Sequence, residues 1–135
     1  MQLTNPPMPP SPNLSIINVV HEQHGLFTNA TLSIINNQPK ATFSFDQHGQ
    51  KFTNEIDLTE NDFESLWSQF NEPVFVRCAV KSPDTKLDFH RNFIIGIIYN
   101  IEGRAGQRTY LIPQNESDPT WQNWLRKFES LHRPI

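Results

Sequence analysis

The residues of this chain that could do metal or acid–base chemistry lie closest together at His21, Glu22 and His24. Imidazole and carboxylate side chains bind zinc and transfer protons, so this segment is the first candidate for a site. A helical metalloprotease pair has four positions from one histidine to the next, whereas here the step is three. A catalytic zinc also needs three protein ligands, which would have to include His48 or His90. We therefore expect structural or solvated histidines and no metal site.

Signatures of a nucleophile or a phosphate-binding loop are weak in this sequence. Cys78, the only cysteine, shares the alternation of Val76 and Val80, which predicts a small core residue rather than a reactive thiolate. Gly103 and Gly106 fall in a predicted hairpin, not at a junction between a strand and a helix, where phosphates bind. We expect no catalytic residue and no cofactor. An enzyme of unrecognised type, in which the histidines converge with an acid, is kept as an alternative.

Large aromatic side chains suggest a different kind of site. Trp67, Tyr99 and Trp124 could line a ligand pocket between a sheet and its covering helices. The tryptophans recur at helical spacing, which favours burial in the core over an exposed platform. A small-molecule-binding protein with these three residues in its pocket is therefore a second alternative.

The overall composition limits the classes of partner. The 135 residues include 11 basic and 14 acidic side chains, a formal charge of −3, which leaves no basic surplus for nucleic acid or anionic lipid. A single cysteine permits no internal disulfide, and no apolar run approaches the roughly 20 residues of a membrane-spanning helix. The first 13 residues hold five prolines and no lysine or arginine, unlike a secretory signal. These features predict a cytoplasmic protein that binds neither nucleic acid nor membranes.

Two segments carry the apolar spacing of amphipathic helices. In each, four large side chains recur at offsets of zero, three, four and seven, which places them on one helical face. The two sets are Phe63, Leu66, Trp67 and Phe70, and Trp121, Trp124, Leu125 and Phe128. Thr59 is predicted to cap a helix over residues 60–71, and Asp118 a helix over residues 119–131. Both apolar faces are expected to pack on a sheet.

Apolar and polar residues alternate in seven other segments, which is typical of half-buried strands. These segments are residues 14–20, 30–35, 41–45, 52–58, 74–81, 87–101 and 107–112. The first 13 residues, rich in proline, are predicted to form an extended arm outside the core. Residues 14–135 are predicted to form a single α+β domain, an antiparallel sheet of six to seven strands with two helices on one face. The expected order is β(β)ββα-βββα, a pseudo-duplication.

Residues 87–101 carry apolar side chains on both faces of the predicted strand. Such a strand needs cover on both sides, either from the chain's own proline-rich arm or from another chain. We expect the face away from the helices to meet another protein. The preferred function is a non-catalytic protein-binding module, such as an immunity or inhibitor protein that neutralises its partner by occlusion. The predicted binding residues are Phe75, Ile94, Ile98 and Tyr110, with acidic flanks at Glu55, Asp57 and Glu102. A second copy of the chain, in a homodimer, is an alternative partner.

Overall fold

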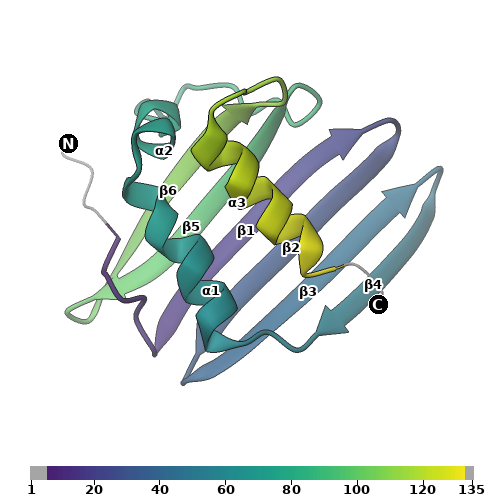
Figure 1. Cartoon of the computed structure of the whole chain (residues 1–135). Coiled ribbons are helices and arrows are strands. Elements are labelled where there is room, and N and C mark those ends of the chain that lie inside the picture. Colours follow the sequence, from purple (N-terminus) through teal and green to yellow (C-terminus); the bar gives the residue numbers. More distant parts are fainter. Residues whose placement is uncertain (1–5, 133–135) are drawn as a thin grey trace.

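The computed structural model describes residues 6–132, which form a six-stranded antiparallel sheet and a layer of helices (Figure 1). The first four strands are β1 (Leu14–Gln23), β2 (Leu26–Ile35), β3 (Gln38–Gln47) and β4 (Gln50–Ile56). Helix α1 (Glu60–Trp67), the short 3₁₀ helix η1 (Ser68–Asn71) and helix α2 (Pro73–Cys78) follow. After them come strands β5 (Asn92–Ile101) and β6 (Arg104–Pro113) and helix α3 (Pro119–Ser130). The predicted α+β class and antiparallel sheet are confirmed.

The strand order, β4-β3-β2-β1-β5-β6, places the first strand beside a strand that follows the helices. Adjacent strands in the described sheet are antiparallel, and all pairs except β1 with β5 are hairpins. Each hairpin turns through two residues with positive φ, the geometry that fits the twist of the strands. These residues are His24 and Gly25, Asn36 and Asn37, His48 and Gly49, and Glu102 and Gly103. The tight turns fix the register, and therefore which side chains face the helices.

Both predicted helical stripes are buried against the sheet, except that Leu125 is only partly buried at the edge. Thr59 Oγ1 accepts a hydrogen bond of 3.1 Å from the backbone N–H of Asp62, which caps α1 as predicted. Asp118 Oδ1 accepts the backbone N–H of Thr120 at 2.8 Å and caps α3 in the same way. Within residues 6–132, no helix is both long enough and apolar enough to span a bilayer.

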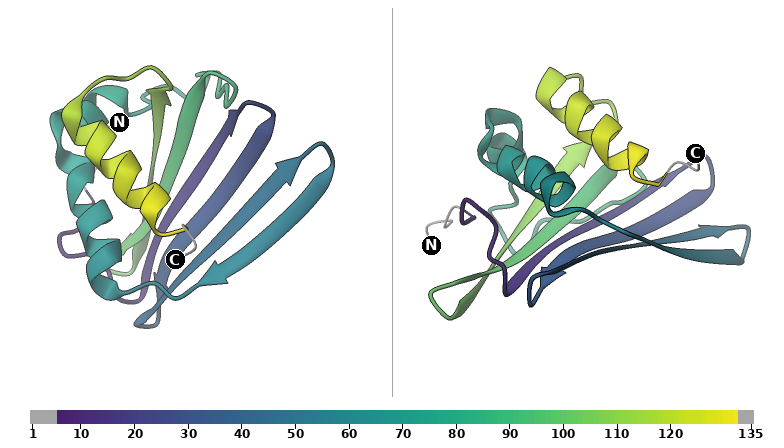
Figure 2. Two further views of the ribbon diagram at one scale, coloured as in Figure 1. Left: turned by 45° about the vertical axis from the view of Figure 1, so that its right-hand side comes forward. Right: turned by 60° about the horizontal axis from the view of Figure 1, so that its bottom comes forward.

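The helices lie on one face of the sheet and leave the opposite face open (Figure 2). Inward side chains such as Ile17 and Ile97 are fully or almost fully buried under the helices. The β3–β4 hairpin extends beyond the helical layer, so the sheet is wider than its cover (Figure 1). This arrangement creates two distinct places for function: the open face, and the uncovered end of the helix side.

One predicted strand is a helix. Residues 74–81 form most of α2 and a short extended segment, in which Ala79 bridges to Tyr110 of β6. Pro73 occupies the first turn of the helix, where a missing N–H costs nothing. Val74 and Phe75 are adjacent and both buried, which a half-buried strand does not allow.

A second predicted strand is shorter than expected. Residues 87–91 belong to a loop, and β5 begins only at Asn92, opposite Pro113 at the end of β6. The two halves of the chain are therefore not equivalent. Four strands precede α1 and α2, whereas two precede α3, so the pseudo-duplication is incomplete.

The described part of the proline-rich segment packs onto the sheet-and-helix unit. Pro6 and Pro10 are buried, and Trp67 Nε1 donates to the carbonyl oxygen of Pro7 at 2.8 Å. Residues 6–13 thus join the packed structure, contrary to the expectation of an arm outside the core. Residues 1–5 lie outside the described residues.

Candidate functional site

The open face of the sheet carries five neighbouring aliphatic side chains, here termed the aliphatic patch. They are Ile16 and Val20 of β1, Ile94 and Ile98 of β5, and Leu111 of β6. The register sets Ile16 opposite Ile98, and Ile94 opposite both Val20 and Leu111. Ile98 is 40 % exposed and the other four are partly exposed. A solvated sheet face is normally polar, so an apolar group here marks a candidate contact surface.

Gly96 leaves open space in the middle of the patch. It lies between Ile94 and Ile98 along β5, and no atom lies within 4 Å of the position that a Cβ would occupy. The residue opposite on β1, Asn18, is tied to β2 because its amide donates to Asn29 Oδ1 at 2.8 Å. A partner side chain could therefore approach the backbone of β5 closely.

The other half of the open face, over β2, β3 and β4, is polar except for Phe27 and Ile35 on β2. Its outward side chains include Asn29, Thr31, Ser33, Lys40, Thr42, Ser44, Asp46, Lys51, Thr53 and Glu55. Lys40 Nζ and Glu55 Oε1 form an ion pair at 3.1 Å. Both side chains are more than half exposed, so this pair contributes little to stability. The open face thus combines an apolar region with a polar one.

Phe75 and Tyr110, predicted to lie on the open face, are instead fully buried on the helix side. Phe75 belongs to α2, and its ring meets Tyr110 edge-on with centroids 5.7 Å apart. The prediction for Phe75 is wrong because residues 74–81 are not a strand. Tyr110 alternates with Leu111 along β6, and only Leu111 faces outward. Burial raises the pKa of the Tyr110 hydroxyl to about 12, so this group stays neutral.

The remaining predicted contact residues are exposed or partly exposed, and the acids among them do not lie together. Ile94 and Ile98 lie on the open face, as expected from the two-sided pattern of their strand. Glu55 and Asp57 lie on and just after β4, at one edge of the sheet. Glu102 lies in the β5–β6 turn, near the opposite edge of the sheet (Figure 1). The three acids therefore do not form a single acidic rim.

Trp67, Tyr99 and Trp124 pack into the core rather than around an open pocket. All three have at most 2 % of their surface exposed. The Trp67 ring meets Tyr99 edge-on at 6.0 Å between centroids, and Trp124 Nε1 donates to the carbonyl oxygen of Leu66 at 3.0 Å. The aromatic pocket proposed from the sequence is thus filled by its own side chains.

The histidines divide between the two faces of the sheet. His90 Nδ1 lies 3.3 Å from Glu22 Oε2, and Glu22 faces the open side. His21 faces the helix side, because it continues the inward alternation of Val19 along β1. His24 follows in the β1–β2 turn. The sequence cluster of His21, Glu22 and His24 is therefore split by the alternation of the strand.

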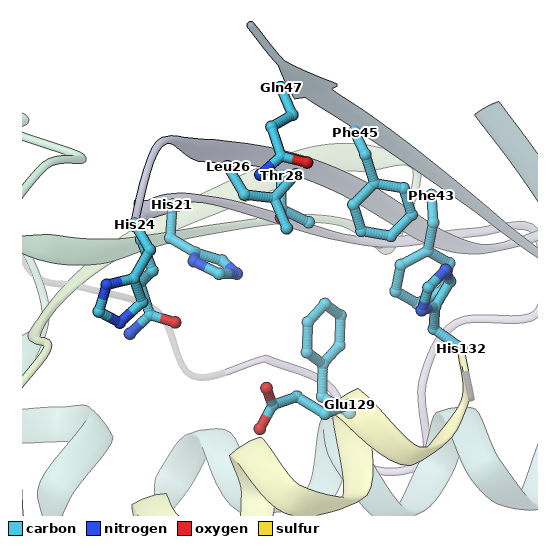
Figure 3. A pocket seen from close by; sticks show the side chains of 11 residues that line it. His21, His24, Leu26, Thr28, Phe43, Phe45, Gln47, Glu129 and His132 are labelled. Carbon is cyan, nitrogen blue, oxygen red and sulfur yellow. The ribbon is translucent and has the colours of Figure 1, made fainter. Parts of the chain in front are cut away.

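A cavity of about 430 Å³ lies between the helix side of the sheet and the end of α3 (Figure 3). Its lining is His21, Gln23, His24, Leu26, Thr28, Phe43, Phe45, Gln47, Phe128, Glu129 and His132. Burial lowers the pKa of the His21 imidazole below its ordinary value of 6.5, so the ring is neutral near pH 7. The His21 ring also packs on Phe93, with centroids 4.5 Å apart. The cavity therefore offers hydrogen bonds, aromatic contacts and the carboxylate of Glu129.

Two further candidates for chemistry lack the surroundings that they would need. Within the described residues, no group of three or more His, Cys, Asp and Glu side chains could hold a metal ion. Cys78 is partly buried against the core, and burial raises the pKa of its thiol. A raised pKa disfavours the thiolate, the form that acts as a nucleophile.

Sequence reasoning missed three of the five patch residues, Ile16, Val20 and Leu111. Their alternation with buried neighbours exists in the sequence, but the nearly continuous apolar run over residues 14–20 obscures it. It also missed the cavity residues other than His21 and His24. These come from three strands and the C-terminal end of α3, and no local spacing brings them together.

Comparisons with protein-family models, with curated proteins and with solved structures find no match to this chain.

Proposed function

We propose that this chain is a non-catalytic protein-binding module that engages its partner through the open sheet face. The observation that carries the proposal is the aliphatic patch, to which three adjacent strands contribute and over which no described helix lies. Protein interfaces commonly have an apolar centre and a polar rim. The patch and the polar half over β2, β3 and β4 supply these two parts.

The extent of the open face suits another protein. Five of the strands have ten residues each, so the sheet measures about 24 Å by 33 Å at the usual strand spacing and rise. The resulting area of about 800 Å² equals what each partner contributes to a standard interface. Small molecules instead bind in concave pockets.

The specific form that we favour is an inhibitor of the immunity type, which neutralises its partner by covering it. Occlusion needs a complementary surface but no nucleophile, metal or cofactor. The exposed acids Glu55, Asp57 and Glu102 at the margins of the sheet would steer a basic partner towards the face. A homodimer, in which a second copy of this chain covers the open face, is the alternative. Sedimentation velocity would distinguish this homodimer from a monomer.

Affinity capture with two surface variants tests the proposal. Ile98→Asp puts a charge into the patch at a side chain that is already 40 % exposed, so we expect the fold to tolerate it. Val76→Asp is the matched control, because Val76 is 47 % exposed but belongs to α2 in the helical layer. We expect a protein retained by the wild type and Val76→Asp to be lost with Ile98→Asp. Equal retention by both variants would exclude the open face as the contact surface.

A further inference from the structure

The cavity on the helix side exists because the helical layer is shorter than the sheet. Helix α3 ends at Ser130, whereas β1, β2 and β3 continue beyond it towards their turns. Figure 3 shows His21 and Thr28 on the sheet side of the space and Glu129 on the helix side. The volume of about 430 Å³ falls within the range of about 300 to 1,000 Å³ that is usual for small-molecule sites.

Aromatic rings form one wall of the cavity. Phe43 packs on Phe128, with ring centroids 5.5 Å apart. The His132 imidazole lies against both Phe43 and Phe45, with centroid distances of 5.2 and 4.4 Å. Aromatic side chains pair well with flat rings through stacked and edge-on contacts. This wall therefore suits a ligand with a flat, apolar ring system.

The charge of the lining selects among such ligands. Among residues 6–132, Glu129 is the only acidic residue of the lining, and neither lysine nor arginine contributes to it. His21 is neutral near pH 7 because burial lowers the pKa of its imidazole. Among the described lining residues, an anionic ligand would find no lysine or arginine to pair with, whereas a cationic group would meet the Glu129 carboxylate at the mouth.

Hydrogen-bonding side chains also line the cavity, and they account for seven of its eleven lining residues. Thr28 is only 5 % exposed and lies opposite His21 in the register, and Gln47 projects into the same space from β3 (Figure 3). Polar groups that converge on one space beside an apolar wall can fix the orientation of a ligand.

We propose that this cavity binds a small aromatic amine, with its ring system against Phe45 and His132 and its ammonium group directed to Glu129. This site lies on the opposite side of the sheet from the aliphatic patch, and it is independent of the proposed protein-binding function.

Three indole compounds of similar size test the proposal on the full-length protein: tryptamine (cationic), tryptophol (neutral) and indole-3-acetate (anionic). We expect tryptamine to bind with a Kd below about 1 mM, the affinity that a ligand of this size can reach. Tryptophol should bind about threefold more weakly, because an exposed ion pair contributes at most about a fivefold gain in affinity, and indole-3-acetate should bind more weakly still. On addition of tryptamine, the backbone amide NMR signals of Leu26, Thr28 and Phe45 should shift, and the signal of Ile94 should not.

Variants separate the charge contribution from the aromatic one. Glu129→Gln should remove the preference for tryptamine over tryptophol, whereas Glu60→Gln, a matched change at the start of α1, should keep it. Phe45→Ala should weaken the binding of tryptamine and of tryptophol by a similar factor. Ile98→Asp should leave their binding unchanged. Three results would each overturn the proposal: no saturable binding below about 1 mM, indole-3-acetate binding as tightly as tryptamine, or shifts centred on the open face.

Discussion

His21 shows how a single strand position determines the character of a site. The sequence pattern ends the first strand at Val20, but β1 continues to Gln23 and pairs with β2 along its whole length. His21 therefore takes the inward phase and lines the cavity, instead of lying in a solvated loop. Its partial burial disfavours the charged imidazole.

This burial predicts a pH-dependent stability. The folded-state pKa of His21 lies below the ordinary value of 6.5, so the unfolded chain binds a proton at a higher pH than the folded chain does. Stability should therefore fall as the pH is lowered through 6.5, and this component should level off below the folded-state pKa.

Urea unfolding of the wild type and His21→Phe across this pH range measures the effect. Phenylalanine keeps a ring against Phe93 but cannot titrate, so the variant should lack this component of the pH dependence. His24, Glu129 and His132, the other titratable groups of the cavity, are present in both proteins and largely cancel in the difference. If the free energies of unfolding of the two proteins changed in parallel with pH, this component could not be assigned to His21.

The reliability of the residue-level predictions depended on the element that carries each residue. Trp67 and Trp124 are buried as their helical spacing predicts, because one helical face is defined by local sequence alone. Phe75 was assigned to the wrong face because strand alternation gives the wrong answer for a helix. Tyr110 shows a different limit, because the packing of η1 and α2 decides which side of the edge strand β6 faces the helices.

At the scale of elements, the hairpins and the two long helices follow from sequence signals. Asn36 with Asn37 and His48 with Gly49 form tight turns at the predicted breaks, and Thr59 and Asp118 cap the helices as predicted. Helix α2 was missed because its six residues are too few to show a helical period. The placement of β5 beside β1 could not be predicted either, because it depends on tertiary pairing across the whole helical segment.

The two glycines within the strands give a matched test of the packing between β5 and β6. Gly106 lies opposite Tyr99, and a Cβ at Gly106 would overlap the Tyr99 ring. That ring is 1 % exposed and held by Trp67, so it cannot move aside easily. Gly106→Ala should lower the free energy of unfolding by about 1 to 3 kcal/mol, as for other overpacked sites.

Gly96→Ala is the control, because nothing lies within 4 Å of its added methyl group. Alanine there should change the free energy of unfolding by no more than about 0.5 kcal/mol, or should stabilise the strand slightly. Chemical denaturation of both variants checks the pair. Equal destabilisation by the two substitutions would show that the Tyr99 ring does not restrict Gly106.

At the scale of the whole molecule, the sheet separates two surfaces of different chemistry. The open face is broad and carries the aliphatic patch beside a polar region. The helix side is closed by the core except at one end, where the cavity lies under the end of α3 (Figure 3). The sequence predicted an outward apolar side for β5 through Ile94 and Ile98, but not the full patch or the cavity, which are assembled from distant segments.

The most direct test of the proposed protein-binding function is a calorimetric titration of the captured partner against the wild type, Ile98→Asp and Val76→Asp. A charge within the patch should cost about 2 kcal/mol or more, as at other interface hot spots, which corresponds to a loss of at least about thirtyfold in affinity. Val76→Asp should bind like the wild type. An affinity of Ile98→Asp within about twofold of the wild type would contradict a contact through the open sheet face.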